Sequence, residues 1–153
     1  FAYNRLHSIH DNIGNLKYLR KLILKKNQLV ELPNSFRNCE SLTLLDVSFN
    51  NLTVLPDFVK MDSLVNLNFQ NNEIERIPDS FSGLKSLQIL NGSHNKLEWI
   101  SPKIKAMRKI IDIDLSYNTI VHDGLPAKSF ESMIELKKLN LTHNEIKEVP
   151  NGK

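Results

Sequence analysis

Asparagine recurs along this chain at a nearly constant interval, and an aliphatic residue follows each copy two positions later. The seven copies of this marker begin at Asn4, Asn27, Asn50, Asn72, Asn95, Asn118 and Asn144. They are separated by 23, 23, 22, 23, 23 and 26 residues. A period of this length is typical of stacked coils, in which no single coil can bury its apolar side alone.

The residues before each asparagine, from the second copy on, follow the pattern L-x-x-L-x-L-x-x-N. Leu19, Leu22, Leu24 and Asn27 give one copy, and similar residues fill the others. The alternation at the centre of the pattern has the period of a strand, so we expect one short strand in each repeat. The asparagine amide can both donate and accept, and therefore suits a turn that bonds to backbone groups of its own and neighbouring coils. We predict a buried stack of these asparagines.

After the asparagine, several repeats read aliphatic-x-x-aliphatic-Pro, as in Leu29 to Pro33 and Ile146 to Pro150. Over essentially its whole length the chain resembles the leucine-rich-repeat superfamily. Two copies continue to a phenylalanine, at Phe36 and Phe81. This variant of the repeat resembles the intracellular scaffold repeats of the Ras-suppressor, Erbin and Scribble kind. The resemblance implies an α/β solenoid, a right-handed curved superhelix. Its parallel sheet would line the concave face, and short helical or irregular returns would line the convex face.

Two departures from the pattern make specific structural predictions. Gly92 stands where a core leucine is expected, and we hypothesise that the ring of Phe69, in the same slot one repeat earlier, fills the space. The sixth repeat is longer than the others, with its extra residues in 121–124. We predict a polar bulge there at the rim of the solenoid. Phe36, Phe81, Phe130, Leu16, Leu84, Ile104 and Met107 should pack inside from the return segments.

The chain is expected to form one domain over residues 1–153, with about seven repeats of which the first and last are incomplete. We therefore expect it to be a segment of a longer protein. No apolar run reaches the roughly 18 residues that span a bilayer, so membrane insertion is not expected. The single cysteine, Cys39, excludes an internal disulfide framework and suits a reducing compartment, which favours a cytoplasmic location.

Residues between the core positions should point outward on the concave sheet, and they form the candidate partner-binding face. The position before each asparagine gives a column that is rich in aromatic and amphipathic residues, which suit interface anchors. A basic cluster lies near the start of the chain and acidic residues lie near its end, so an extended partner of opposite polarity would be oriented. The predicted binding residues are Arg20, Lys21, Lys25, Lys26, Asp46, Phe49, Asn68, Asn71, Asn91, His94, Asp112, Asp114, Tyr117, Asn140 and His143. Ser48, Ser93 and Ser116 are expected on the same surface.

No pattern in the chain indicates catalysis, and we expect neither a metal nor a cofactor. The five histidines are scattered over different repeats, and no Cys or carboxylate set completes a zinc site. Asp112 and Asp114 lie on an open face that offers little desolvation for acid–base work. The basic cluster covers one strand only, which argues against nucleic acid as a partner. Three glycosylation sequons, at Asn51, Asn91 and Asn140, are about as many as chance supplies.

The sequence therefore predicts a module that binds another protein, most simply an intracellular scaffold or signalling adaptor. Two alternatives stay open. The repeats could be the recognition arm of a larger enzyme or receptor, or they could belong to a secreted recognition domain. Flanking sequence, Cys-rich caps and glycan on the sequons would separate these alternatives.

Overall fold

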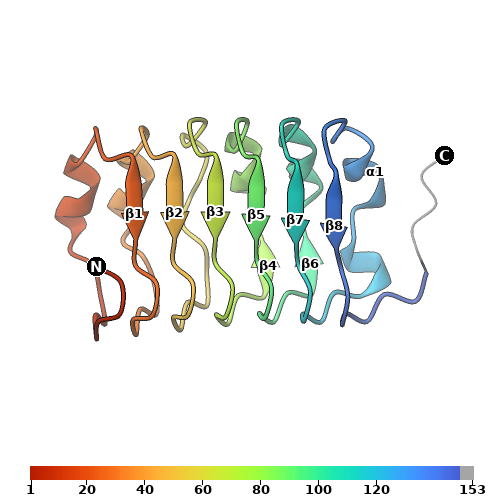
Figure 1. The fold of residues 1–153 in the computed structure, drawn as a ribbon, viewed down its shortest axis with the longest axis horizontal. Coiled ribbons are helices and arrows are strands. Elements are labelled where there is room, and N and C mark those ends of the chain that lie inside the picture. Colours follow the sequence, from red (N-terminus) through yellow and green to blue (C-terminus); the bar gives the residue numbers. More distant parts are fainter. Residues whose placement is uncertain (149–153) are drawn as a thin grey trace.

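A computed structural model describes residues 1–148, with the backbone alone for His122 and Ala127. The last two residues of the Ile146 to Pro150 pattern lie outside the described residues. The chain winds through successive coils, and Figure 1 shows one strand of each coil standing beside the next along the long axis. The predicted solenoid is confirmed.

The main sheet is parallel and contains six strands of three residues each. These six strands lie side by side in the order in which they follow along the chain, and two shorter strands form a separate sheet. Its pairings are in register, so that Leu22 lies beside Leu45 and Leu45 beside Leu67. The strands are β1 (Lys21–Ile23), β2 (Leu44–Asp46), β3 (Asn66–Asn68), β5 (Ile89–Asn91), β7 (Asp112–Asp114) and β8 (Lys138–Asn140).

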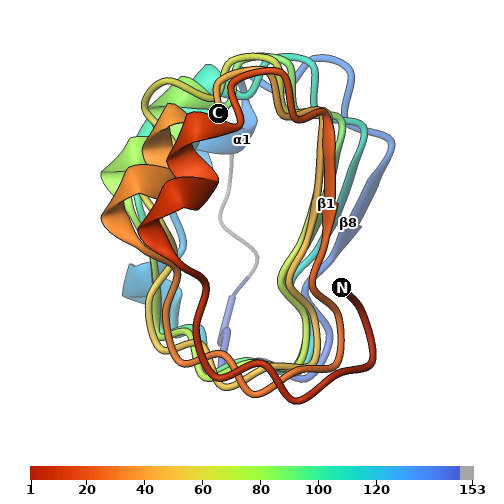
Figure 2. The same cartoon turned by 90° about the vertical axis from the view of Figure 1, so that its left-hand side faces the viewer.

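The return side of the coils carries short helical turns, most of them of the 3-10 type. Figure 2, a view along the stack of coils, shows these turns on the side opposite the sheet. The turns η1, η2 and η3 each start just after a residue in extended conformation. For η2 and η3 this residue is a proline, Pro33 or Pro78, which fits the limited helix that proline allows. The turns are η1 (Asp11–Asn15), η2 (Asn34–Asn38), η3 (Asp79–Gly83), η4 (Pro102–Ala106), η5 (His122–Gly124) and α1 (Ala127–Phe130).

The core lies between the sheet and the returns. The middle residue of each main-sheet strand from β1 to β7 is buried, whereas Leu139 of β8, the last strand, is 41% exposed. Phe36, Phe81, Leu84, Ile104 and Met107 pack inside as predicted, and Phe130 is partly buried. The prediction for Leu16 was wrong, since half of it is exposed.

Phe58 also belongs to this core, although the repeat pattern did not single it out. It is fully buried, and its ring meets that of Phe81 edge to face with centroids 5.3 Å apart. It lies in a return that has no helical turn, two residues after Pro56 rather than the three that separate Pro33 from Phe36. The aromatic pair joins the third and fourth coils on the return side.

The predicted asparagine stack forms from Asn27 to Asn144, although Asn95 and Asn144 are half-buried rather than buried. In a representative coil, the Asn72 amide nitrogen donates to the carbonyls of Phe69 and Val47, each at 3.0 Å, and its oxygen accepts from Leu52 N–H at 2.9 Å. One side chain thus satisfies groups of its own coil and of the preceding one. Asn4 departs from the pattern, because it is exposed and donates only to the nearby carbonyls of Phe1 and Ala2.

The space beside Gly92 is filled by Phe69, as hypothesised. A Cβ atom on Gly92 would lie 2.4 Å from Cζ of the Phe69 ring and 3.0 Å from a methyl carbon of Leu115. Phe69 is completely buried there. The larger residue of one coil therefore compensates for the missing side chain of the next, and no cavity results.

The long sixth repeat differs from the predicted rim bulge. Residues His122–Gly124 form η5, and Val121 makes an isolated parallel bridge with Glu145. Gly124 is buried so close to the preceding coil that a Cβ atom would lie 2.0 Å from the Glu98 carbonyl oxygen. The insertion is thus packed onto its neighbour, and glycine is needed for that approach rather than for a loose turn.

A second sheet, which the sequence did not predict, joins two adjacent coils between the asparagine turn and the return. β4 (Arg76–Ile77) pairs in parallel with β6 (Trp99–Ile100). The inward residues Ile77 and Ile100 are the aliphatic positions that follow the asparagine by five. This small sheet stiffens the middle of the solenoid.

Candidate functional site

The outward side chains of the six-stranded sheet form a continuous surface, which we call the sheet face. Because the strands are in register, these side chains line up in columns that run across the coils. The first column contains Lys21, Leu44, Asn66, Ile89, Asp112 and Lys138. The second column contains Ile23, Asp46, Asn68, Asn91, Asp114 and Asn140. The sheet face is the predicted concave binding face.

The Asp and Asn residues of the second column stabilise the ends of their own strands. The Asp46 carboxylate accepts from Ser48 N–H at 3.0 Å and from the Ser48 hydroxyl at 2.6 Å. Asn91 accepts from Ser93 in the same way, at 3.1 and 2.9 Å. Asn68, Asp114 and Asn140 each accept from the backbone N–H two residues later. These are Asx turns, so five of the predicted binding residues also have a structural role.

The serines two positions after Asp46, Asn91 and Asp114 were expected on the surface, and this expectation was wrong. Ser48 is completely buried, and Ser93 and Ser116 are 5% and 4% exposed. Their hydroxyl groups donate to the Asp or Asn residue two positions earlier. The polar side chains therefore fold back onto the strand instead of facing a partner.

The position before each asparagine has a left-handed backbone in every coil, and we call this set the turn column. Its φ angles lie between 53° and 58° at Tyr3, Lys26, Phe49, Asn71, His94, Tyr117 and His143. Non-glycine residues adopt this region uncommonly, and bulky ones rarely. The asparagine bonds on either side hold the turn in place, so the same conformation accepts several side chains.

Aromatic rings of the turn column stack on each other at the C-terminal end of the sheet face. Tyr117 lies between His94 and His143, with centroid distances of 4.3 and 4.2 Å and interplanar angles of 8° and 16°. Nearly half of the Tyr117 side chain is still exposed. The stack therefore presents a rigid aromatic edge to solvent.

At the N-terminal end, lysines and aromatic rings form a second group. The ammonium nitrogens of Lys25 and Lys26 lie 5.4 and 5.6 Å from the centroid of the Phe49 ring, and Lys26 also lies 5.0 Å from that of Tyr3. These distances are typical of cation–π contacts. The rings hold the lysine side chains over the sheet face without neutralising their charge.

Charges near the C-terminal end are compensated within the chain. Lys138 Nζ lies 3.4 Å from the Asp112 carboxylate, and the Asn140 amide donates to Asp114 at 3.2 Å. Burial alone would raise the pKa of Asp114, but hydrogen bonds from Ser116 and Asn140, together with the charge of Lys138, lower it. The predicted acidic end is thus closer to neutral as a surface than its carboxylates alone suggest.

Thirteen of the fifteen predicted binding residues lie on the sheet face or in its turn column, and Arg20 and Lys25 lie just before and after β1. The fifteen residues spread over six coils and do not converge on a single point. The basic end and the aromatic stack were indicated by the order of residues along the repeats. The Asx turns and the left-handed turn column were not, although the Asx-x-Ser spacing at Asp46, Asn91 and Asp114 was a usable signal. This arrangement suits recognition of an extended molecule across the coils.

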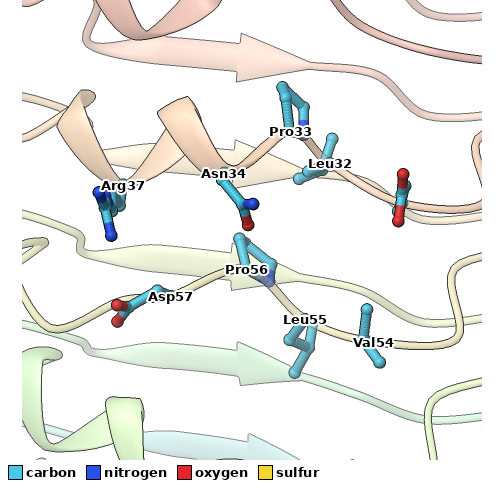
Figure 3. Close-up of a pocket in the computed structure, with 9 residues that line it drawn as sticks. Leu32, Pro33, Asn34, Arg37, Val54, Leu55, Pro56 and Asp57 are labelled. Atoms are coloured by element: carbon cyan, nitrogen blue, oxygen red, sulfur yellow. The ribbon is translucent and has the colours of Figure 1, made fainter. Parts of the chain in front are cut away.

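A shallow pocket of about 200 Å³ lies away from the sheet face, between the second and third coils (Figure 3). The two Leu-Pro segments, Leu32-Pro33 and Leu55-Pro56, line it, and Figure 3 shows Arg37 and Asp57 together at one end. The coil that contains Pro56 has no helical turn where the preceding coil has η2, and this difference leaves the space. Its charged side chains are exposed, so the pocket offers little desolvation.

Two features of the described residues bear on metals and membranes. Residues 1–148 contain no group of three His, Cys, Asp or Glu side chains placed to hold a metal ion. None of the helices in that range is long and apolar enough to cross a membrane. Cys39 is buried, its thiol donates to the Ile13 carbonyl at 3.4 Å, and burial raises its pKa.

A family model described as "Leucine-rich repeat region" matches residues 3–148. The chain belongs to the leucine-rich repeat family. Human fibromodulin is 26% identical over 138 residues, a stretch that covers 90% of this chain and 30% of fibromodulin. The chain therefore spans less than a third of that relative.

Solved leucine-rich repeat structures agree with the fold. A leucine-rich repeat protein of Leptospira interrogans superimposes with a TM-score of 0.86 at 28% identity, over 94% of this chain and 36% of that one. The ectodomain of the Arabidopsis thaliana membrane receptor kinase GASSHO1/SCHENGEN3, solved in complex with CASPARIAN STRIP INTEGRITY FACTOR 2, gives 0.81 at 29% identity, over 91% and 17% of the two chains. These comparisons establish the superfamily and leave the resemblance to intracellular scaffold repeats as a prediction.

Proposed function

We propose that this leucine-rich repeat chain is the recognition part of a larger protein and binds another polypeptide on its sheet face, without catalysing a reaction itself. The observation that carries the proposal is the ordered sheet face, whose aromatic stack and lysine–aromatic group are held rigidly while their side chains stay exposed. Rigid aromatic and basic residues are frequent anchors of protein interfaces. The similarity to a receptor ectodomain that was solved with its ligand favours a receptor-like role over a free adaptor.

Phe49 and Tyr117 provide the direct test, because they mark the two ends of the sheet face and are 37% and 46% exposed. Cross-linking pull-downs of the full-length protein should lose a partner when both are replaced by Ala. The matched control replaces Tyr18 and Val59, which are 93% and 57% exposed but lie on the return side of the strands. If the double Phe49→Ala, Tyr117→Ala variant keeps every partner while the control variant loses one, binding takes place on the returns.

An intracellular scaffold is the second candidate, and Cys39 is the observation that favours it. This thiol is unpaired and buried, as expected for a chain that folds in a reducing compartment. Protease treatment of intact cells that express the tagged full-length protein separates the two candidates. Digestion from outside supports the receptor-like role, and protection until lysis supports the scaffold.

A further inference from the structure

The middle of the sheet face has side-chain hydrogen-bond donors that are not used, whereas the matching acceptors are used. The side-chain oxygens of Asn68 and Asn91 are occupied, since they accept from the N–H groups of Gln70 and Ser93. Their amide nitrogens donate to no acceptor within residues 1–148, and both side chains are half-buried. In contrast, the Asn140 amide is used by Asp114. β3 and β5 therefore present donors whose matching acceptors must come from elsewhere.

Positive charge without a neutralising partner is also unevenly distributed, and it gathers around β1. Arg20, Lys21, Lys25 and Lys26 form no ion pair with a carboxylate among the described residues, whereas Lys138 at the other end lies on Asp112. Positive charge on the first two strands and their turns thus exceeds negative charge, which is limited there to Asp46. Uncompensated cations therefore lie together at this end of the sheet face, where they would attract an anionic group.

Apolar side chains lie among these lysines. Ile23 and Phe49 are 44% and 37% exposed, and Leu44 is half-buried beside Lys21 in the register of β1 and β2. A ligand at this end therefore meets cations and an apolar surface together. Carboxylate-bearing residues next to an aliphatic or aromatic residue satisfy both.

We infer that the sheet face takes an extended, acidic polypeptide segment. Its carboxylates lie over Lys21, Lys25 and Lys26, and its main-chain carbonyls accept from Asn68 and Asn91. This inference rests on the proposed function and adds the chemistry and direction of the partner. Six strands at roughly 4.8 Å spacing span about 24 Å, which an extended chain covers with about seven residues.

A continuous polyanion such as nucleic acid or a sulfated polysaccharide fits this surface less well. The negative charges of such a ligand would extend past β2 as far as Asp112 and Asp114 on β7. That strand has no uncompensated cation to neutralise them. A polypeptide can place its acidic residues at one end only. The observed gradient therefore favours a polypeptide.

The second column supplies matched variants, because both Asp and Asn occur there in the same Asx turn. Asn91→Asp keeps the oxygen that accepts from Ser93, as Asp46 does with Ser48, but replaces the amide donor by a negative charge. Asp46→Asn does the reverse: it adds a donor and removes a negative charge. Both variants should fold like the parent chain, which a thermal melt verifies.

The probe is a library of heptapeptides displayed on phage and selected against the full-length protein, followed by anisotropy measurements on the selected fluorescein-labelled peptides. We expect peptides with Asp or Glu at one end. Lys25→Glu with Lys26→Glu should weaken their binding at least about tenfold, and Lys103→Glu with Lys105→Glu on the return side should not change it. Asn91→Asp should weaken binding about threefold to tenfold and Asp46→Asn should tighten it, because each variant changes one hydrogen-bond donor together with one unit of negative charge.

The outcomes separate the two levels of the proposal. Selected peptides without acidic residues, or equal binding by the Asn91→Asp and Asp46→Asn variants, would overturn the acidic-segment inference and leave the binding face standing. Failure to select any peptide that depends on Phe49 and Tyr117 would overturn the proposed function itself. A heparin oligosaccharide that binds more tightly than the peptides would identify a polyanion as the occupant.

Discussion

At the scale of single residues, the asparagine stack is the feature on which the coils depend. Asn72 is 8% exposed and bonds to three backbone groups in two coils. Its replacement leaves the Leu52 N–H without its partner, whereas the Val47 and Phe69 carbonyls each keep one bond, from Asn50 and Asn95. The stack therefore links each coil to the next through polar contacts as well as through the core.

Asn72→Ala should lower the free energy of unfolding by about 1–3 kcal/mol, the cost of unpaired buried polar groups. Urea denaturation followed by circular dichroism measures this change. Asn4→Ala is the control, since Asn4 is exposed and bonds only to nearby carbonyls. Equal losses in the two variants would show that the stack is not the cause.

Asp114 makes stability depend on pH in a predictable direction. Its pKa in the folded chain lies below the ordinary value of 3.8, so its ionised form is stabilised by folding. This contribution is complete well above pH 4 and is lost as the pH falls through the lowered pKa. Asp114→Asn, which matches Asn91 of the same column, should remove that part of the acid sensitivity. Parallel pH profiles of unfolding for the two proteins would contradict the assignment.

At the scale of strands and turns, the sequence was most informative where side chains alternate. The strands and the inward leucines followed from the period, and the Phe69–Gly92 compensation followed from reading two repeats together. The β4–β6 sheet could not be predicted, because two residues in each strand carry too little pattern and the pairing depends on how adjacent coils meet. The packed insertion was missed for a similar reason, since the approach of Gly124 to Glu98 involves different coils.

Gly92→Ala should destabilise the chain by about 1–3 kcal/mol, because the new methyl group meets the buried Phe69 ring. Phe69→Leu should make room for that methyl group. Thermal denaturation of the two single variants and the double variant tests this, and the double variant should lose less than the two single losses combined. Additive losses would mean that the ring and the glycine are independent.

The location of the candidate site was predicted from the sequence, but the hydrogen bonds and ion pairs of its side chains were not. Periodicity placed thirteen of the fifteen residues on the sheet face or in its turn column, and the other two beside β1. It could not reveal that Asp46 and Asn91 accept hydrogen bonds from serines, or that Asp112 is compensated by Lys138 from the next coil. Those facts depend on side-chain conformation and on contacts between coils, and a repeat pattern contains neither.

At the scale of the whole molecule, charge varies along the axis of the solenoid. The uncompensated lysines near β1 give one end of the sheet face a positive field, while the end near β8 is balanced. Fields of this kind mainly increase the rate at which an oppositely charged partner associates. The asymmetry is therefore expected to appear in kinetics.

Association of the selected acidic peptide should slow as salt is raised from 0.1 to 1 M, because the screening length falls from about 10 to about 3 Å. Stopped-flow fluorescence at several salt concentrations measures the rate. The Lys25→Glu, Lys26→Glu variant should show a much weaker salt dependence, with the Lys103→Glu, Lys105→Glu variant as control. A salt dependence that is equal in all three proteins would place the steering charges elsewhere.

The turn column has one more consequence. Seven coils hold tyrosine, lysine, phenylalanine, asparagine and histidine in the same backbone conformation, with φ angles that differ by only 5°. The scaffold thus tolerates whichever side chain occupies that place, and a substitution there changes the surface without altering the path of the chain. Substitutions in the turn column can therefore change the binding specificity one coil at a time while the backbone stays the same.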